Sequence, residues 1–335
     1  MSAAESLLLP AHLQVSYRQA TPAQVLADDV LAVFGFGDAA PRHEDPRYLR
    51  VGLQPQGTAP LEIWRGRGPV THGRDGDVAW SEDGALQFGV IELDEGDLDT
   101  GDGDIEATAC RIYARLTEFT RARGYPHLLR IWNYLDGITH GDGDAERYRV
   151  FCVGRARGLG SFDPHALPAA TAVGRSDDAR RLLVYWLAAR TPGTPLENPR
   201  QISAYRYPRQ YGPQPPSFAR GMLPASAQVP LLISGTAAVV GHESRHAESV
   251  SAQLEETLVN LDTLIAIAHA QRPELPARMG AGTVLKVYVR EREEMDAVTR
   301  QLRERLDPAV PFLVLHAAIC RRELRVEIDG SHAPA

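Results

Sequence analysis

Residues 201–221 combine tyrosines, arginines and prolines in a way that suits the binding of an anion. The segment, QISAYRYPRQYGPQPPSFARG, contains three tyrosines, three arginines and four prolines. No acidic residue occurs between Glu197 and Glu243, although the whole chain has a net charge of -7. Guanidinium groups bind carboxylates through paired hydrogen bonds, phenols add uncharged donors, and prolines stiffen the backbone. We therefore expect an anion pocket here. The alternative is a proline-rich surface connection with solvated arginines.

A second motif has the spacing of a zinc site. His242, Glu243 and His246 match HExxH, in which both histidines bind zinc from one face of a helix and the glutamate acts as a base. Here the motif follows a predicted strand and a glycine turn, and the apolar pattern of the next helix begins only at Val250. This placement favours a strand-to-helix connection over a zinc site.

Ser234 and Gly235 directly follow the apolar residues Leu231–Ile233. A glycine at the end of a strand lets the backbone approach a ligand closely, and the N–H groups exposed there can bind an oxyanion. The alternative is an ordinary β-bulge or turn.

Glu327 is a candidate acid on the last predicted strand. Because side chains alternate along a strand, Glu327 and Asp329 share one face, and Val326 and Ile328 share the other. If the acidic face is solvated, Glu327 is an ordinary surface residue. If that face meets the arginine-rich segment, Glu327 is the best-placed acid in the chain. Periodicity leaves both possibilities open.

The composition is that of a globular protein, with 44% hydrophobic and 24% charged residues. We find no apolar run of about 18 residues that would span a membrane, and no signal peptide at the N-terminus. Three widely spaced cysteines indicate reduced thiols in the cytoplasm, and the acidic balance argues against a nucleic-acid partner. The expected partner is a small anionic molecule, bound by a monomer or a small homo-oligomer.

Lys286 is the only lysine in the chain. Either the protein needs a compact ammonium group at this position, or the lysine is present by chance on a solvated strand face.

The predicted elements follow the same order in each half of the chain. The first half begins with four predicted strands, at Gln14–Tyr17, Val30–Phe36, Leu61–Trp64 and Leu86–Leu93. The pattern then predicts a helix from Ile105 to Phe119, a strand at Leu128–Tyr134, a helix at Ala145–Gly158, and strands at Ala169–Val173 and Leu182–Leu187. In the second half it predicts a strand at Val229–Ser234, a helix from Val250 to Ala268, a strand at Val284–Val289, a helix at Arg292–Leu306, and strands at Phe312–Ala318 and Leu324–Ile328.

This repetition predicts an α+β fold of two modules, each a mixed sheet with two helices packed on one face. The proline-rich stretch Thr191–Arg200 separates them. We therefore expect a first domain at residues 1–190, which includes extra strands, and a second at residues 191–335, which carries most of the active site.

The motifs of the second half resemble those of a known family. EETLVNLDTLI, VLKVYVR and CRRELRVEID are similar to segments of the reactive-imine deaminase (RidA) family, whose modules have the YjgF, chorismate-mutase-like fold. More specifically, WNYLDGI, SAYRYPRQYGPQPPSFARG, LLISGTAAVVGHESRH and CRRELRVEIDG resemble the chorismatases, which split pyruvate from chorismate and have two RidA-like halves. The resemblance covers residues 61–330.

The resemblance implies an enzyme without metal or cofactor that acts on a dianion, with the catalytic acid at Glu327. Two pocket positions differ between hydroxybenzoate-forming members and hydrolases. Cys320 matches the hydroxybenzoate-forming type, whereas Ala237 matches the hydrolases. The expected substrate-binding residues are Tyr205, Tyr207, Tyr211, Arg220, Ser234, Gly235, Ala237 and Trp132, the last as an apolar wall from the first half.

The reaction implied is the conversion of chorismate to 3-hydroxybenzoate, 4-hydroxybenzoate or both, with release of pyruvate. Such products supply aryl pigments and quinones. Three alternatives remain open. One is hydrolysis of chorismate to a dihydroxycyclohexadiene carboxylate. The second is a zinc hydrolase that uses His242 and His246. The third is a RidA-like module that binds an anion without catalysis.

Overall fold

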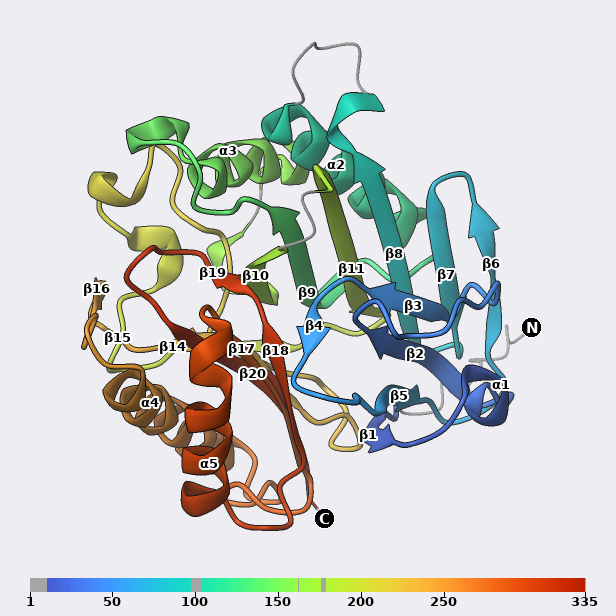
Figure 1. Cartoon of the computed structure of the whole chain (residues 1–335). Coiled ribbons are helices and arrows are strands. Elements are labelled where there is room, and N and C mark those ends of the chain that lie inside the picture. Colours follow the sequence, from blue (N-terminus) through green and yellow to red (C-terminus); the bar gives the residue numbers. More distant parts are fainter. Residues whose placement is uncertain (1–10, 98–103, 162, 176–178, 335) are drawn as a thin grey trace.

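Two copies of one β-α-β-α-β-β unit form most of the computed structural model, which describes residues 11–97, 104–161, 163–175 and 179–334 (Figure 1). The first unit consists of β8 (Leu86–Asp94), α2 (Ile105–Ala122), β9 (His127–Asp136), α3 (Arg147–Leu159), β10 (Ala169–Arg175) and β11 (Arg181–Ala189). The second consists of β14 (Leu231–Ala237), α4 (Val250–Gln271), β17 (Thr283–Val289), α5 (Met295–Arg305), β18 (Phe312–His316) and β20 (Val326–His332).

The two units have the same strand order and directions. The first runs β10-β9-β11-β8 and the second β18-β17-β20-β14. In each unit only the first pair is parallel. The predicted α+β fold of two repeated modules is therefore confirmed.

Additional strands extend both sheets and form a third one. The first sheet gains β7 (Val78–Glu82), β6 (Thr71–Asp75) and β19 (Ala318–Ile319), and the second gains β13 (Gly221–Leu223), β12 (Thr194–Leu196) and β4 (Gln54–Pro55). A four-stranded N-terminal sheet contains β1 (Gln14–Arg18), β5 (Leu61–Arg65), β2 (Val30–Phe36) and β3 (Tyr48–Val51), with the short helix α1 (Pro22–Val25) beside it. A two-stranded ribbon consists of β15 (Val239–Val240) and β16 (Glu243–Ser244).

The helices cover the outer face of each sheet (Figure 1). On α2, every predicted apolar position from Ile105 to Phe119 is buried, and the Asp104 side chain caps the helix by accepting a hydrogen bond from the Glu106 N–H. On α4, Leu254, Leu258 and the apolar residues that follow are buried against β14 and β20. Each fully buried leucine contributes roughly 1.5–3 kcal/mol to this packing.

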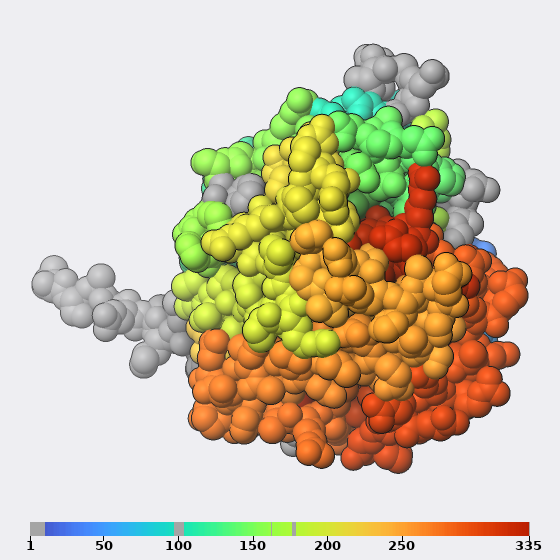
Figure 2. Space-filling model, turned by 90° about the vertical axis from the view of Figure 1, so that its left-hand side faces the viewer, coloured from blue at the N-terminus to red at the C-terminus, as the bar shows by residue number. Residues whose placement is uncertain are grey.

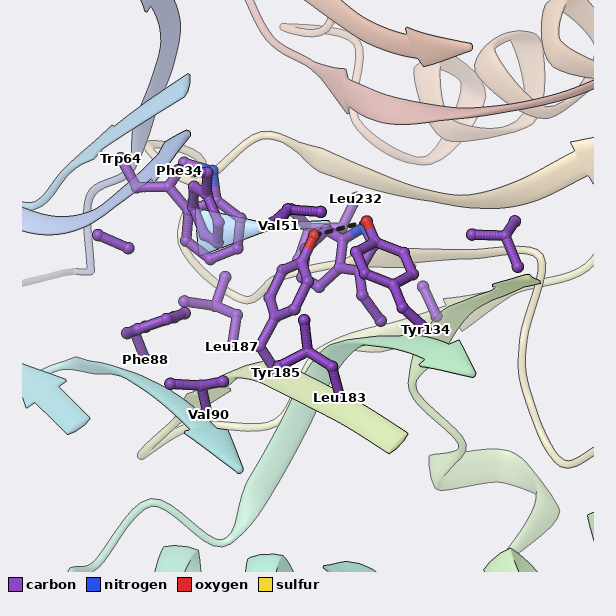
Figure 3. Close-up of a cluster of buried hydrophobic side chains, with 14 of the residues drawn as sticks. Phe34, Val51, Trp64, Phe88, Val90, Tyr134, Leu183, Tyr185, Leu187 and Leu232 are labelled. Carbon is purple, nitrogen blue, oxygen red and sulfur yellow. Dashed lines mark hydrogen bonds between the residues drawn. The ribbon is translucent and has the colours of Figure 1, made fainter. Parts of the chain in front are cut away.

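The inner faces of the three sheets meet in one hydrophobic cluster. Phe34 and Trp64 of the N-terminal sheet pack on Phe88 and Tyr185 of the first unit (Figure 3). The Tyr134 and Tyr185 hydroxyl groups point toward one another and share a hydrogen bond of 2.9 Å. The second unit contributes Leu232 and others to the same cluster, so the interior joins all three sheets.

Lys286 lies in this interior. It is 3% exposed, and its ammonium group lies 3.2 Å from the Glu62 carboxylate and 4.0 Å from that of Asp329. Burial disfavours the charge, but the two carboxylates outweigh burial and raise the pKa of Lys286. A solvated strand face is therefore the wrong explanation for this residue, because β17 is a central strand whose inner face is covered by the N-terminal sheet.

We keep the division into residues 1–190 and 191–335 as a proposal. The strand β11 ends at Ala189 and β12 begins at Thr194. Two short strands cross this division, since β19 pairs with β10 and β4 pairs with β18.

None of the described helices is long and apolar enough to cross a membrane. The first ten residues, for which the sequence predicts no signal peptide, lie outside the described residues.

Candidate active site

A cavity of about 460 Å³ lies between the two units. Its walls come from α3 and β10 of the first unit, from residues 201–221, and from β14, β20 and the turn before β20 in the second unit. The yellow surface of residues 201–221 joins the green surface of the first half to the orange surface of the second (Figure 2). A cavity of this size suits a small-molecule ligand.

Glu327 lies in the wall of the cavity. Alternation along β20 directs Val326 and Ile328 into the core beneath α4, so Glu327 faces the first unit instead. The Glu327 side chain is 4% exposed, and no described residue forms a hydrogen bond with its carboxyl group. The acidic face of this strand therefore meets the arginine-rich segment.

The surroundings of Glu327 favour its protonated form. Burial is the largest cause, the negative charge of Asp329 is the second, and together they raise the pKa of Glu327 to about 8. The charges of Arg130, Arg220 and Arg290 act in the opposite direction. At neutral pH the carboxyl is therefore mostly protonated and can donate a proton into the cavity.

Gly235 makes room for this carboxyl group. The pairing of β14 with β20 shifts register between Ile233 and Thr236, which is a β-bulge at the predicted position. A Cβ atom on Gly235 would lie 2.0 Å from Glu327 Oε1. The β-bulge, which was the alternative explanation of this glycine, is therefore present, and the group that approaches Gly235 closely is a carboxyl of the protein itself. Only glycine leaves this carboxyl in its place, and the binding of an oxyanion by the N–H groups here stays a prediction.

Arg220 is a buried cation beside the cavity. It is 5% exposed, and its Nη2 donates to the Tyr207 hydroxyl at 2.7 Å and to the Ile202 carbonyl at 2.9 Å. Its Nε has no partner, and no carboxylate lies within ion-pair distance of it among the residues that the structure describes. Burial raises the pKa of the nearby Glu197 carboxyl, and the positive charge of Arg220, which lowers this pKa, is the smaller effect. Arg220 thus keeps binding capacity for an anion.

Arg155 of α3 is a second such cation, which the sequence analysis missed. It is 3% exposed, its Nη2 donates to the Ser217 carbonyl at 2.8 Å, and its Nε has no partner in the described part of the chain. Gly154 lets α3 pack closely on α2, since a Cβ there would lie 2.1 Å from the Glu106 carbonyl oxygen. A sequence signal existed, because no acidic residue occurs three or four positions from Arg155 on either side.

The cavity mouth carries stacked aromatic and guanidinium groups. Arg321 lies over the Tyr211 ring, 4.1 Å from its centre, and over the Tyr207 ring at 5.0 Å. Its Nη1 donates to the His242 carbonyl at 2.8 Å, and the Tyr211 hydroxyl lies 3.3 Å from His242 Nδ1. These contacts hold residues 201–221 against the turn before β20.

The HExxH segment does not lie on a helix. Glu243 belongs to the ribbon strand β16, and His246 has a left-handed backbone with φ of 56° and lies beside Glu256. Within the described residues, no group of histidine, cysteine, aspartate or glutamate side chains is arranged to hold a metal ion. The predicted strand-to-helix connection is confirmed.

The cavity brings together most of the predicted site residues. It is lined by Tyr207, Tyr211, Arg220, Gly235, Ala237, Cys320 and Glu327. Burial is the main cause that raises the pKa of the Cys320 thiol, so the thiol is neutral near neutral pH. Further lining residues that the sequence analysis did not select are Tyr148, Arg149, Arg155, Thr171, Gln201 and Arg321.

Three predicted residues lie outside the cavity wall. Tyr205 is half-buried on the preceding turn, next to the guanidinium of Arg206. The Ser234 hydroxyl accepts from the Ala170 N–H at 2.9 Å and donates to the Ala219 carbonyl, so it joins backbone segments behind the wall.

The expectation that Trp132 forms a wall of the pocket is wrong. Its ring stacks on Tyr185 at 4.7 Å and its Nε1 donates to Asp329 at 3.0 Å, which places it in the interior between the sheets. Trp132 and Tyr185 are opposite each other in the pairing of β9 with β11, which explains the stacking.

The site therefore combines the largely protonated carboxyl of Glu327 with two buried arginines, Arg155 and Arg220, that form no ion pair with any carboxylate in the described part of the chain. Such a site suits a dianion that receives a proton.

Comparisons with known proteins give consistent similarities. The family model "Chorismatase FkbO/Hyg5-like, N-terminal" matches residues 62–188. A chorismatase from Streptomyces rapamycinicus is 38% identical over 278 residues, which are 80% of this chain and 81% of that protein. A 3-hydroxybenzoate synthase from Streptomyces hygroscopicus is 33% identical over 282 residues, which are 80% of each chain. The crystal structure of a chorismatase covers 96% of this chain and 98% of its own, with 33% identity and a TM-score of 0.84.

Proposed function

Because the chain belongs to the chorismatase family, we propose that it removes pyruvate from chorismate and forms 3-hydroxybenzoate, 4-hydroxybenzoate or both. The observation that carries the proposal is the Glu327 carboxyl, which is buried, largely protonated at neutral pH and directed into the cavity. Two buried arginines line the same cavity, and the Nε of each has no partner among the described residues. Chorismate is a dianion with a ring carboxylate and an enolpyruvyl carboxylate, so its charges match these arginines.

The first step is a proton transfer. Glu327 donates its proton to the methylene carbon of the enolpyruvyl group, which becomes the methyl group of pyruvate. The bond between C3 of the ring and the ether oxygen then breaks, and its electron pair forms the carbonyl group of pyruvate. The ring is left with a positive charge centred on C3, and Glu327 is left as a carboxylate that can take a proton back.

The second step determines the product. Loss of the C4 hydrogen as a proton gives 4-hydroxybenzoate directly. Attack of the C4 hydroxyl oxygen on C3, with its proton passing to the Glu327 carboxylate, gives an arene-oxide-like species that opens to 3-hydroxybenzoate. Both routes conserve all atoms of chorismate without added water, and the gain of an aromatic ring makes both strongly favourable.

Arg155 and Arg220 would bind the two carboxylates, with Tyr207 and Tyr211 as further donors. This proposal rests on their burial and on the unpaired Nε of each arginine. Such contacts would fix the ring relative to Glu327, and correct orientation accounts for a large part of the rate in reactions of this kind.

Chorismate hydrolysis is the second candidate, and Ala237 is the observation that favours it. Ala237 lies opposite Glu327 in the pairing of β14 with β20, and it lines the cavity together with Cys320. Water that reached C3 would give the dihydroxycyclohexadiene carboxylate instead of an aromatic product. Only the aromatic products, the hydroxybenzoates, would serve as precursors of aryl pigments and quinones.

The decisive experiment incubates the purified protein with chorismate. Pyruvate is measured with lactate dehydrogenase, and the ring products are separated by chromatography. Hydroxybenzoate and pyruvate in equal amounts support the proposal, and the diene carboxylate supports the hydrolase. Binding without pyruvate release would indicate a non-catalytic module. A repeat after chelation, with elemental analysis, tests the zinc hydrolase, which requires bound zinc and loss of turnover on its removal.

A further inference from the structure

Asp329 lies two residues beyond Glu327 on the same face of β20, just behind the cavity. Its side chain is 0% exposed, so it makes no contact with bulk solvent. An aspartate at this depth needs strong partners, because an unpaired carboxylate in the interior would become protonated.

One oxygen of Asp329 accepts four hydrogen bonds. The donors are Tyr288 at 2.9 Å, Thr171 at 2.7 Å, Trp132 at 3.0 Å and the guanidinium of Arg130 at 3.2 Å. They come from β9, β10 and β17, so strands of both units meet at this carboxylate.

Two cations lie beside Asp329: Lys286, 4.0 Å from its Oδ1, and Arg130, which is the closer one. The side chain of Arg130 is 0% exposed, and it forms a buried ion pair with Asp329. It also donates to the Thr171 hydroxyl, and Thr171 lines the cavity. The Arg130 charge is therefore held beside the active site, where it would favour the carboxylate form of Glu327 if it were not compensated.

Charges from several elements act on Glu327. Asp329 on β20 raises its pKa, whereas Arg130 on β9, Arg220 before β13 and Arg290 after β17 lower it. Two neutral groups also face it, the Cys320 thiol at the end of β19 and the Tyr148 phenol on α3. Among the described residues whose charges act most strongly on the Glu327 carboxyl, Asp329 is the only anion.

We propose that Asp329 is a positioning residue for the reaction: it compensates Arg130 and faces Glu327 with a fixed negative charge, and so it keeps Glu327 in the protonated form that donates the proton. The inference rests on the proposed function, since it takes Glu327 as the proton donor. Asp329 itself is not placed to touch the substrate, because it is not among the residues that line the cavity. Its Oδ2 is held by the four donors, and its Oδ1, which has no hydrogen-bond partner among the described residues, lies 4.0 Å from the ammonium group of Lys286.

The test is the pH dependence of kcat/KM for pyruvate release. The wild type should be active while Glu327 is protonated and lose activity as the pH rises through about 8. Asp329→Asn removes the negative charge and leaves Arg130 uncompensated, so its descending limb should move to lower pH by about one unit or more. Tyr288→Phe is the matched control. It removes one donor to Asp329 but changes no charge, so its limb should coincide with that of the wild type.

Asp329→Asn leaves a buried guanidinium unpaired and could fail to fold. The double variant Arg130→Gln/Asp329→Asn removes both charges, and its limb should lie between those of the wild type and Asp329→Asn. The infrared band of the protonated carboxyl, isolated by subtracting the spectrum of Glu327→Gln, reports the same titration without turnover.

The possible failures are distinguishable. If the wild type releases no pyruvate from chorismate, the proposed function is wrong. If the wild type is active and the limbs of Asp329→Asn and of the double variant coincide with that of the wild type, the proposed function stands and the role of Asp329 is overturned. A shift in Tyr288→Phe as large as that in Asp329→Asn would show that packing, not charge, controls Glu327.

Discussion

At the scale of single residues, the chemistry depends on a carboxyl group that stays protonated near neutral pH. Burial and the charge of Asp329 raise the pKa of Glu327 to about 8. Glu327→Gln keeps the volume of the side chain but cannot donate a carboxyl proton. Turnover should therefore fall at least ~100-fold, which is the low end for general acid–base catalysis. The check is pyruvate release under saturating chorismate, with chorismate affinity measured by calorimetry. Wild-type turnover in this variant would mean that Glu327 is not the acid.

Arg220 should contribute to substrate recognition through charge. Arg220→Ala removes a buried cation that would pair with a carboxylate, and the loss in kcat/KM should correspond to about 2–5 kcal/mol. Arg220→Lys should recover only part of this loss, because an ammonium group lacks the paired geometry of the guanidinium. The matched control is Arg206→Ala on the same segment, whose side chain is exposed and outside the cavity. Equal kinetics for Arg220→Ala and Arg206→Ala would contradict the role.

Cys320 should influence the product without taking part in proton transfer. The thiol is neutral and lines the cavity near Glu327. Cys320→Ala opens space that water can enter, so the product should shift from hydroxybenzoate toward the dihydroxycyclohexadiene carboxylate. Chromatography of the ring products provides the measurement. An unchanged product ratio would show that the volume at this position does not control water access, even if pyruvate release continues.

At the scale of elements, the bulge of β14 positions the acid. Gly235→Ala would place a methyl group 2.0 Å from Glu327 Oε1, so the carboxyl must move. Kinetic assays should show a large loss of kcat, while the overpacking costs only about 1–3 kcal/mol of stability and the chain still folds. Gly68→Ala is a suitable control, because no atom lies within 4 Å of its added Cβ. Full activity of Gly235→Ala would refute the proposed positioning of Glu327.

At the scale of the whole molecule, a buried ion pair joins the N-terminal sheet to the second unit. Lys286 on β17 pairs with Glu62 on β5, and both side chains are 3% exposed. Lys286→Met leaves the Glu62 carboxylate buried without its cation, which should reduce the free energy of unfolding by about 3–5 kcal/mol. Urea denaturation measures this change. The double variant Lys286→Met/Glu62→Gln should recover part of the loss, and a single variant as stable as the wild type would contradict the prediction.

Much of the local structure could be predicted because local patterns determine it. The apolar positions of α2 recur at helical spacing and are all buried. The strand β2 has the predicted bounds, Val30–Phe36, because a continuous apolar run between turn residues has few alternatives. The closing strand was predicted at Leu324–Ile328, whereas β20 extends from Val326 to His332. Its polar end is stabilised by pairing with β14 and β17, which is not a local property.

By itself, the sequence determined the order of elements within the two repeated units, the motifs of the family and the fact that Glu327 and Asp329 share one strand face. It could not determine what covers that face, because burial depends on the sheet opposite. Tertiary structure decided that Glu327 faces the cavity and that Trp132 and Lys286 face the interior between the sheets. It also brought Arg155 to the site from a helix without any motif. The physical reason is that burial and charge, which set the protonation of Glu327, arise from groups far apart in the chain.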